Sequence, residues 1–259
     1  MQIATWNVNS VRARQERVTA FLQRTNVDVL AMQEIKCKPE QFPVEAFEAI
    51  GYKIISHGLN QWNGVAFAYK QDLEAEDIET SFDQQPEFKD VQEARALGAT
   101  FNGVRVWSLY VPNGRGLDDP HMQYKLEFLD RLAATTAEQL EMDPGLEIAL
   151  VGDFNVAPLD TDVYDLSMFE THVSPPEREA FEAFEQIGLT DKLRELVPGE
   201  YTYWDYKDLC FPKNNGMRID FVLTSEALTD RVRSASIERE ERKGELPSDH
   251  VPVVIEISS

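Results

Sequence analysis

Apolar residues along this chain gather into short runs that are typical of buried strands, and segments with a helical period separate many of them. Asn102-Gly103 lies between two of the runs and predicts a two-residue hairpin turn, and therefore at least one antiparallel pair of strands. Longer connections elsewhere predict crossovers. The strand-like runs cover residues 2–6, 27–32, 52–56, 64–70, 96–101, 104–110, 146–151, 219–223 and 251–257.

Helices are predicted where a capping residue precedes an apolar stripe. The predicted caps are Ser10, Asp119 before Pro120, and Ser174 in a capping box with Glu177. The apolar faces are Val11, Val18, Phe21 and Leu22; then Met122, Leu126, Leu129 and Ala133; then Phe181, Phe184 and Ile187, ending at Gly188. Two packed mixed β-sheets flanked by helices accommodate this mixture, so we expect a mixed α/β fold in one domain over residues 1–259.

Polar side chains recur where the apolar runs end. The most informative case is Gly152-Asp153-Phe154-Asn155, which follows a buried run and places a carboxylate and a carboxamide at its end. Ligands of open α/β sheets commonly bind at such strand ends, so the sequence predicts one polar site assembled by folding. Its candidate residues are Asn7, Asn9, Glu34, Tyr110, Asp153, Asn155, Asp220, Asp249 and His250.

The chemistry of this set is dominated by oxygen donors, which suit Mg²⁺ or Mn²⁺ and disfavour zinc. A single histidine beside carboxylates is suited to acid/base work or to stabilising developing negative charge. A metal, carboxylates and one oriented histidine together favour attack of water on a phosphate ester. Each residue alone also fits a turn or a cap. His57, His121 and His172 lack such a context, and we interpret them as surface or structural residues.

Composition changes this picture in one respect. The 259 residues carry 25 basic and 46 acidic side chains, a net charge of −21, which at face value disfavours a polyanionic substrate. The acids are unevenly spread, however, and residues 1–38 are locally basic, whereas acidic segments such as 71–93 are typical of a solvated surface.

The absence of a signal-peptide core or membrane-spanning run predicts a cytoplasmic protein with no membrane association. Cys37 and Cys210 are expected to be reduced thiols.

The strand-end motifs resemble, in order and over the whole length, the exonuclease III and abasic-site endonuclease branch of the endonuclease/exonuclease/phosphatase superfamily. The most specific segment is Asn-Gly-Met-Arg-Ile-Asp, which ends at Asp220. The other motifs are Asn7-Val8-Asn9, Gln33-Glu34-Ile35-Lys36, Tyr110-Val111-Pro112-Asn113, Gly152-Asp153-Phe154-Asn155 and Ser248-Asp249-His250. The resemblance implies a four-layer αββα sandwich with the site at one edge of its two sheets.

The resemblance also implies roles for the site residues. Glu34 would hold Mg²⁺, or Mn²⁺ in its place, and the residues implied around the metal are Asn7, Glu34, Asp153, Asn155, Asp249 and His250. The implied catalytic residues are Tyr110, Asp153, Asn155, Asp220 and His250, with Asp153 handling a proton and His250, paired to Asp220, stabilising phosphoryl charge. The implied DNA contacts are Asn113, Arg115, Tyr203, Trp204 and Arg218, although core packing explains Trp204 equally well.

The function implied is that of a monomeric Mg²⁺-dependent DNA-repair nuclease. It would cut duplex DNA on the 5′ side of abasic sites, and it would also act at 3′ ends as an exonuclease and 3′-phosphatase. The alternative from the wider superfamily is a phosphatase or phosphodiesterase acting on a small or lipid phosphate. A catalytically inactive DNA-binding protein is disfavoured because none of the implied site residues is missing.

Overall fold

Two six-stranded mixed β-sheets form the centre of the protein in the computed structural model, which describes residues 1–258. The first sheet has the order β11 (Val232–Ile237), β12 (Val253–Ile257), β1 (Gln2–Asn7), β2 (Val29–Gln33), β4 (Val65–Lys70) and β3 (Tyr52–His57). The second has the order β5 (Glu76–Glu79), β6 (Ala96–Phe101), β7 (Val104–Tyr110), β8 (Ile148–Asp153), β10 (Asp220–Thr224) and β9 (Thr190–Asp191).

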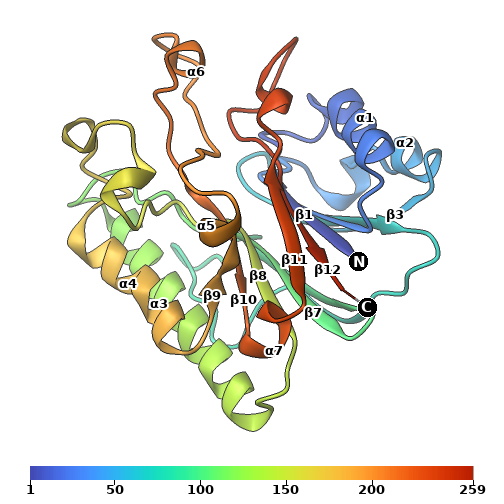
Figure 1. Cartoon of the computed structure of the whole chain (residues 1–259), viewed down its shortest axis with the longest axis horizontal. Helices are drawn as coiled ribbons and strands as arrows, with labels where there is room; N and C mark the ends of the chain where they lie inside the picture. The colour runs from blue at the N-terminus through green and yellow to red at the C-terminus, as the bar shows by residue number, and fades with distance from the viewer. Residues whose placement is uncertain (259) are drawn as a thin grey trace.

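Helices cover the outer face of each sheet (Figure 1). These helices are α1 (Gln15–Thr25) and the short α2 (Val44–Glu48) on the first sheet, and α3 (Pro120–Met142) and α4 (Pro175–Gln186) on the second. Further short helices are α5 (Lys192–Leu196), α6 (Cys210–Lys213) and α7 (Glu226–Thr229), with 3₁₀ turns at Pro39–Gln41, Asp160–Asp162, Leu166–Met168 and Arg239–Arg242. The layers therefore follow the predicted αββα order. Within residues 1–258, no helix is both long and apolar enough to cross a membrane.

Side-chain alternation along the strands separates three hydrophobic cores. Ile3 and Val29 point into the core between the sheets, whereas Ala4, Trp6 and Leu30 point outward to the core beneath α1 and α2. A third core joins the second sheet to α3 and α4. Because both faces of the central strands are buried, their sequences are apolar at nearly every position, as expected for strands enclosed on both sides.

The predicted hairpin and two of the three predicted helix starts are confirmed. Asn102 and Gly103 have φ of 49° and 82°, and they connect β6 to β7. Asp119 accepts a hydrogen bond from the backbone N–H of His121, and Glu177 accepts one from the backbone N–H of Ser174. These local interactions were available from the sequence because each involves residues within three positions of one another.

The prediction for the first helix was wrong at its start. The helix begins at Gln15 and not after Ser10, because the backbone N–H groups of Ser10 and Val11 donate to the carbonyls of Glu34 and Ile35. The sequence analysis also missed three strands. Strand β5 is acidic, β9 is only two residues long, and polar residues interrupt the apolar ones in β11. Strand boundaries otherwise differ by about two residues, as is usual for such assignments.

Candidate active site

Strand pairing brings the predicted polar residues to one edge of the two sheets. In the first sheet, parallel β1 and β2 end there, with Asn7 opposite Gln33. In the second, parallel β7 and β8 end with Tyr110 opposite Asp153. Strand β10 runs antiparallel to β8 and begins at the same edge, so that Asp220 also lies opposite Asp153. The register of three strands therefore sets these groups side by side.

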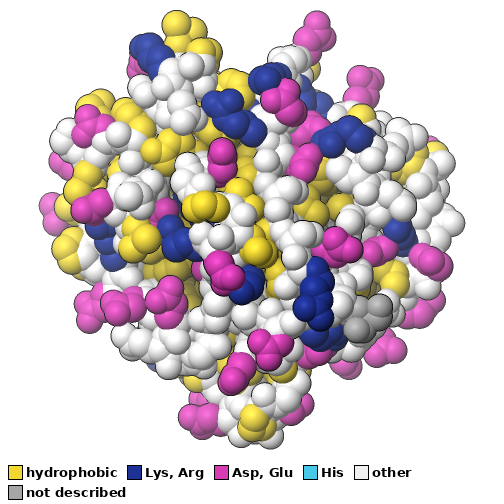
Figure 2. All heavy atoms as spheres, in the orientation of Figure 1, with side chains coloured by type: hydrophobic (Ala, Val, Ile, Leu, Met, Phe, Trp, Pro, Cys, Tyr) yellow, Lys and Arg dark blue, Asp and Glu magenta, His cyan; other side chains and the backbone are white. Residues whose placement is uncertain are grey.

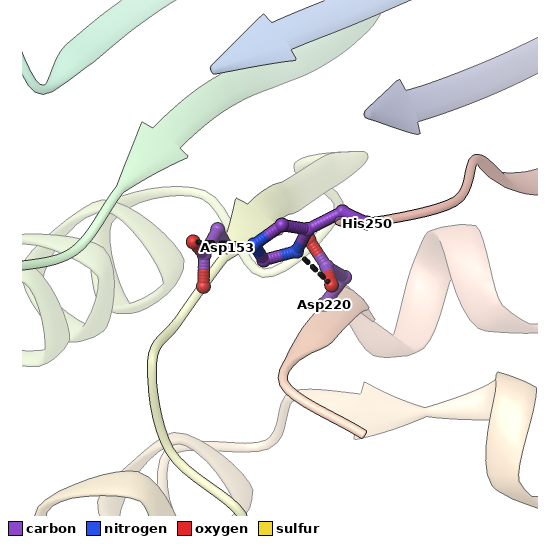
Figure 3. A group of neighbouring side chains, drawn as sticks. All are labelled: Asp153, Asp220 and His250. Carbon is purple, nitrogen blue, oxygen red and sulfur yellow. Dashed lines mark hydrogen bonds and ion pairs between the residues drawn. The ribbon is translucent and has the colours of Figure 1, made fainter. Parts of the chain in front are cut away.

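The imidazole of His250 lies between two aspartates (Figure 3). Its Nδ1 is 2.8 Å from Asp220 Oδ2, and its Nε2 is 3.7 Å from Asp153 Oδ2. Thr202 holds Asp220 in place, because its hydroxyl donates to Asp220 Oδ2 at 2.7 Å. Tyr203 packs edge-on against the imidazole with a centroid distance of 5.0 Å. Both ring nitrogens of His250 are thus directed at carboxylates.

Burial and charge shift the protonation equilibria of this cluster strongly. Burial, together with the nearby charge of Asp220, raises the pKa of Asp153 to about 7. The charge of His250 lowers this pKa but does not offset the other two effects. Burial alone would lower the pKa of His250, but Asp220 and Asp153 outweigh it and raise that pKa to about 10. Such an arrangement pairs an imidazolium with a carboxyl group that exchanges its proton near neutral pH.

Oxygen donors gather on the first-sheet side of the cluster. Asn7 Nδ2 donates to Glu34 Oε2 at 2.8 Å and to Asp153 Oδ2 at 3.0 Å, so it joins the two carboxylates. The Lys36 ammonium is 2.9 Å from Glu34 Oε1 and 2.7 Å from Asn9 Oδ1. These oxygens therefore already attract a cation, and their chemistry fits a hard divalent metal.

Asp249 lies on the rim of the same cavity, where its Oδ1 accepts a hydrogen bond of 3.1 Å from Asn9 Nδ2. Tyr110 lies across the cavity, with the Arg95 guanidinium 4.8 Å from its ring centroid. Burial, followed by the charge of Glu34, raises the pKa of Tyr110 well above its ordinary value. Its phenol consequently stays protonated and can donate a hydrogen bond.

Asn155 is fixed on all sides. Its backbone N–H donates to Asp153 Oδ1 at 2.9 Å, and its Nδ2 donates to the Val111 carbonyl at 2.9 Å. Its Oδ1 accepts a hydrogen bond of 3.1 Å from His172 Nε2, while Asn113 Nδ2 lies 3.4 Å from the same oxygen. Asn155 adopts the left-handed conformation with φ of 50°, which asparagine tolerates better than most residues.

His172 was expected to be a surface or structural residue, and it takes a buried structural position beside the cavity. It is 8% exposed and lines the same cavity as Asp153. Burial, with the nearby Lys125 charge, lowers the pKa of His172 to about 3, so the ring is neutral at physiological pH. No local motif marks His172, because it reaches the site only through the packing of the segment before α4.

A buried ion pair between α3 and α4 supports the site from below. Lys125 Nζ contacts Glu177 Oε1, and both side chains are fully buried. The same ammonium donates to the carbonyls of Asn155 at 2.6 Å and of Asn113 at 3.3 Å. The sequence analysis missed Lys125. Its apolar stripe for α3 contained the neighbouring Leu126, which is less buried than Lys125.

The residues expected to contact DNA divide into two groups. Asn113 and Arg115 are exposed and Tyr203 is half-buried, all beside the cavity. Arg218 is 2% exposed, donates to the Val197 carbonyl at 3.0 Å and lies 3.5 Å from Asp191. Trp204 is fully buried. Direct DNA contact by Arg218 and Trp204 does not fit this burial, so that expectation is corrected: both support the loop before β10.

The cavity at the centre of these residues measures about 220 Å³. It is lined by Glu34, Tyr110, Asn113, Asp153, Asn155, His172, Tyr203, Met217, Ile219, Asp249 and His250. A space of this size admits a phosphate group and an adjoining sugar but not a large ligand. Most of its lining is polar, which suits a charged group held by hydrogen bonds.

Known proteins are similar to this chain in sequence and in structure. Residues 4–250 match the endonuclease/exonuclease/phosphatase family. The chain is 30% identical to exodeoxyribonuclease III of Haemophilus influenzae, with 98% of each chain covered. Its structure matches the 3′ phosphatase NExo from Neisseria bound to a product DNA hairpin and an AP endonuclease from Archaeoglobus fulgidus, each at 34% identity, a TM-score of 0.92 and full coverage of both chains.

These matches and the geometry of the site agree. The chain belongs to the endonuclease/exonuclease/phosphatase family and is a hydrolytic nuclease of its exonuclease III and abasic-site endonuclease branch.

Proposed function

We propose that this protein is a Mg²⁺-dependent DNA-repair nuclease that hydrolyses the phosphodiester on the 5′ side of an abasic site and leaves a 3′-hydroxyl. It also removes nucleotides and phosphates from 3′ ends. The observation that carries the proposal is the buried His250, held by Asp220 and directed at Asp153 beside the Glu34 carboxylate. Named relatives that act as an exodeoxyribonuclease, a 3′ phosphatase and an AP endonuclease support the substrate class.

Proton transfer in this mechanism belongs to Asp153. Its carboxylate takes the proton of the attacking water, which Asn155 positions through its fixed carboxamide. The protonated His250 hydrogen-bonds a phosphoryl oxygen and stabilises the charge that grows there, while Asp220 keeps its ring oriented. Tyr110 donates its phenolic hydrogen to the phosphate. Together these residues supply in-line positioning and electrostatic stabilisation.

Glu34 and Asn7 would hold the divalent metal, with Asp249 at the rim. A bound Mg²⁺ supplies charge stabilisation to the phosphate oxygens. Lys36 then has a defined role as the neighbour that balances the carboxylate of Glu34. Mn²⁺ has the same preference for oxygen donors and would substitute for Mg²⁺.

Asn113, Arg115 and Tyr203 face the DNA in this proposal. Asn113 and Arg115 bind backbone phosphates, which fixes the register of the duplex without reading its sequence. Tyr203 contacts the sugar of the nucleotide placed in the cavity. Extrusion of an abasic nucleotide into such a cavity costs little because no base pair is broken.

The test uses two labelled duplexes, one with a single synthetic abasic analogue and one with a 3′-terminal phosphate, each with Mg²⁺ or with EDTA. We expect the wild type to nick the first and dephosphorylate the second only with Mg²⁺. Asp153→Ala should lower kcat by about 10²- to 10⁴-fold, the range for loss of a general acid or base. Asp130→Ala, which removes an exposed carboxylate on α3, is the matched control.

Two results would contradict the proposal. Hydrolysis of an inositol or lipid phosphate by a wild type that leaves both duplexes intact would replace the substrate class. Nicking by Asp153→Ala at the wild-type rate would remove Asp153 from the mechanism while leaving the nuclease assignment in place.

A further inference from the structure

A second hollow adjoins the active-site cavity on the side of β7 and α3. It measures about 470 Å³, and we name it the Trp62 pocket after its most exposed member. Besides Trp62 it is lined by Glu93, Arg95, Tyr110, Asn113, Arg115 and His121. Tyr110 and Asn113 line both this pocket and the central cavity, so the two hollows adjoin at these residues.

A third hollow adjoins the central cavity through different residues. It measures about 290 Å³ and shares His172, Tyr203 and Met217 with that cavity. The central cavity therefore has one neighbouring hollow at Tyr110 and another at Tyr203. A polynucleotide with its reacting phosphate in the central cavity has one nucleotide on each side of that phosphate. The arrangement of three adjoining hollows suits such a chain.

Trp62 is exposed to solvent, although hydrogen bonds hold the backbone of its loop. This residue is 70% exposed, whereas the other three tryptophans are at most 2% exposed. The Trp62 backbone N–H donates to Asn60 Oδ1 at 2.9 Å. The next two residues are tied down as well, because the Asn63 carbonyl accepts from Lys36 N and the Gly64 N–H donates to the Ala94 carbonyl. A fixed loop thus presents an apolar aromatic surface to water.

The floor of the Trp62 pocket is polar and on balance basic. Arg95 is 6% exposed and pairs with Glu93 at 2.6 Å. Arg115 is exposed and forms no ion pair with any residue among 1–258. His121 is 3% exposed, and its Nδ1 has no hydrogen-bond partner within the described residues. An unpartnered buried nitrogen is costly unless a ligand or water completes it.

We propose that the Trp62 pocket binds one nucleotide of the DNA next to the scissile phosphate, with its unpaired base stacked on Trp62 and its phosphate at Arg115. This proposal rests on the nuclease function proposed above and specifies its substrate further. Stacking on an aromatic side chain accepts any base, since every base has an aromatic face. His121 Nδ1 completes its hydrogen bonding with a polar atom of the same nucleotide. A paired base is already stacked within the duplex, so a frayed or extruded nucleotide is the preferred occupant.

The experiment couples a change in the protein to a change in the DNA. Dissociation constants are measured in EDTA, which arrests cleavage, on duplexes with a recessed 3′ end. One duplex is unmodified, and two others lack the base of either the last or the next-to-last nucleotide. Trp62→Ala should weaken binding of the unmodified duplex at least five-fold, as loss of one stacked base implies. The same substitution should change binding less than two-fold on one of the two base-deleted duplexes, which identifies the nucleotide.

Companion variants separate stacking from other effects. Trp62→Phe keeps an aromatic face and should retain most of the affinity. Arg115→Ala should weaken all three duplexes by the same factor, because phosphate contact is independent of the base. Met142→Ala removes an 81% exposed apolar side chain at the far end of α3 and should change nothing. DNA should also quench the fluorescence of the wild type, whose single exposed tryptophan is Trp62.

Two failures are distinguishable. If the wild type binds and cleaves DNA but Trp62→Ala has the same effect on all three duplexes, or none, the Trp62 pocket does not bind a base and the nuclease proposal stands. If the wild type neither binds nor cleaves any duplex, the nuclease proposal itself fails, and the Trp62 proposal fails with it.

Discussion

Replacing Lys125 with methionine removes the ammonium that pairs with Glu177 in the buried ion pair below the active site. Removing one partner of a buried ion pair typically costs about 3–5 kcal/mol, because the other charge is left without compensation. The carbonyls of Asn155 and Asn113 lose a donor at the same time, although water can reach the exposed Asn113. We therefore expect Lys125→Met to lower the free energy of unfolding by about 4 kcal/mol, with a fall in Tm of about 8–16 °C.

The pH dependence of this loss gives a second signature. Burial would raise the pKa of Glu177, but Lys125 outweighs burial and keeps that pKa below its ordinary value. In Lys125→Met, burial is opposed only by the hydrogen bonds from Ser174 and from the His172 backbone, and we expect the pKa of Glu177 to rise above that of the unfolded chain. The stability that a raised pKa of Glu177 provides is complete below the pKa of this group in the unfolded chain. It is lost as the pH rises through the pKa in the folded protein. The variant should be more destabilised at pH 8 than at pH 5.

The assay is urea unfolding of the wild type, Lys125→Met and the double variant Lys125→Met/Glu177→Gln at both pH values. Glutamine at 177 removes the charge and can still accept the hydrogen bond from the Ser174 backbone N–H. The double variant should recover most of the stability and lose the extra pH dependence. A single variant that loses less than 1 kcal/mol, or a double variant no more stable than the single, would refute the reasoning.

Two further predictions concern other parts of the fold. Gly152→Ala should lower the free energy of unfolding by more than about 3 kcal/mol in urea, because the added Cβ would lie 2.0 Å from the Leu109 carbonyl oxygen of the neighbouring strand. Gly103→Ala should lower it by only about 1–2 kcal/mol, because the φ of 82° is unfavourable for alanine but no atom lies within 4 Å of the added Cβ. Equal losses in the two variants would contradict this explanation. His121→Phe should remove about 2 kcal/mol of the stability difference between pH 7 and pH 4.5. Burial, with the charges of neighbouring arginines, lowers the pKa of His121 to about 4, so the stability it contributes is complete above pH 6.5 and is lost as the pH falls. An acid limb unchanged by His121→Phe in urea titrations would contradict it.

Much of the fold was predictable because its signals are local. The hairpin at Asn102-Gly103 depends on two residues that tolerate positive φ, and the start of α3 depends on Asp119 two positions from the N–H that it caps. The strands of the two-sheet core were found from their apolar runs. By contrast, β9 and β11 were missed, since their pairing with β10 and β12 comes from neighbours and not from their own composition.

The candidate site was predictable to a different degree. The sequence placed Asp153, Asp220 and His250 in one set because each lies at the end or start of an apolar run. It left His172 undecided between a surface and a structural position, and it expected Arg218 to contact DNA. Neither position could be read from the sequence, since the exposure of a polar side chain depends on which other segments pack over it.

By itself, the sequence determined which chemical groups were available and where most of the apolar strands and two of the three predicted helices would form. Alternating apolar positions, short capping motifs and polar strand ends act over a few residues, so they are legible in one dimension. Only the tertiary structure decided which polar groups lose water and gain partners. Lys125 meets Glu177 across 52 positions, and His250 meets Asp220 across 30. Desolvation and pairing across such separations set the pKa of each group, and therefore decide which side chains carry chemistry and which support it.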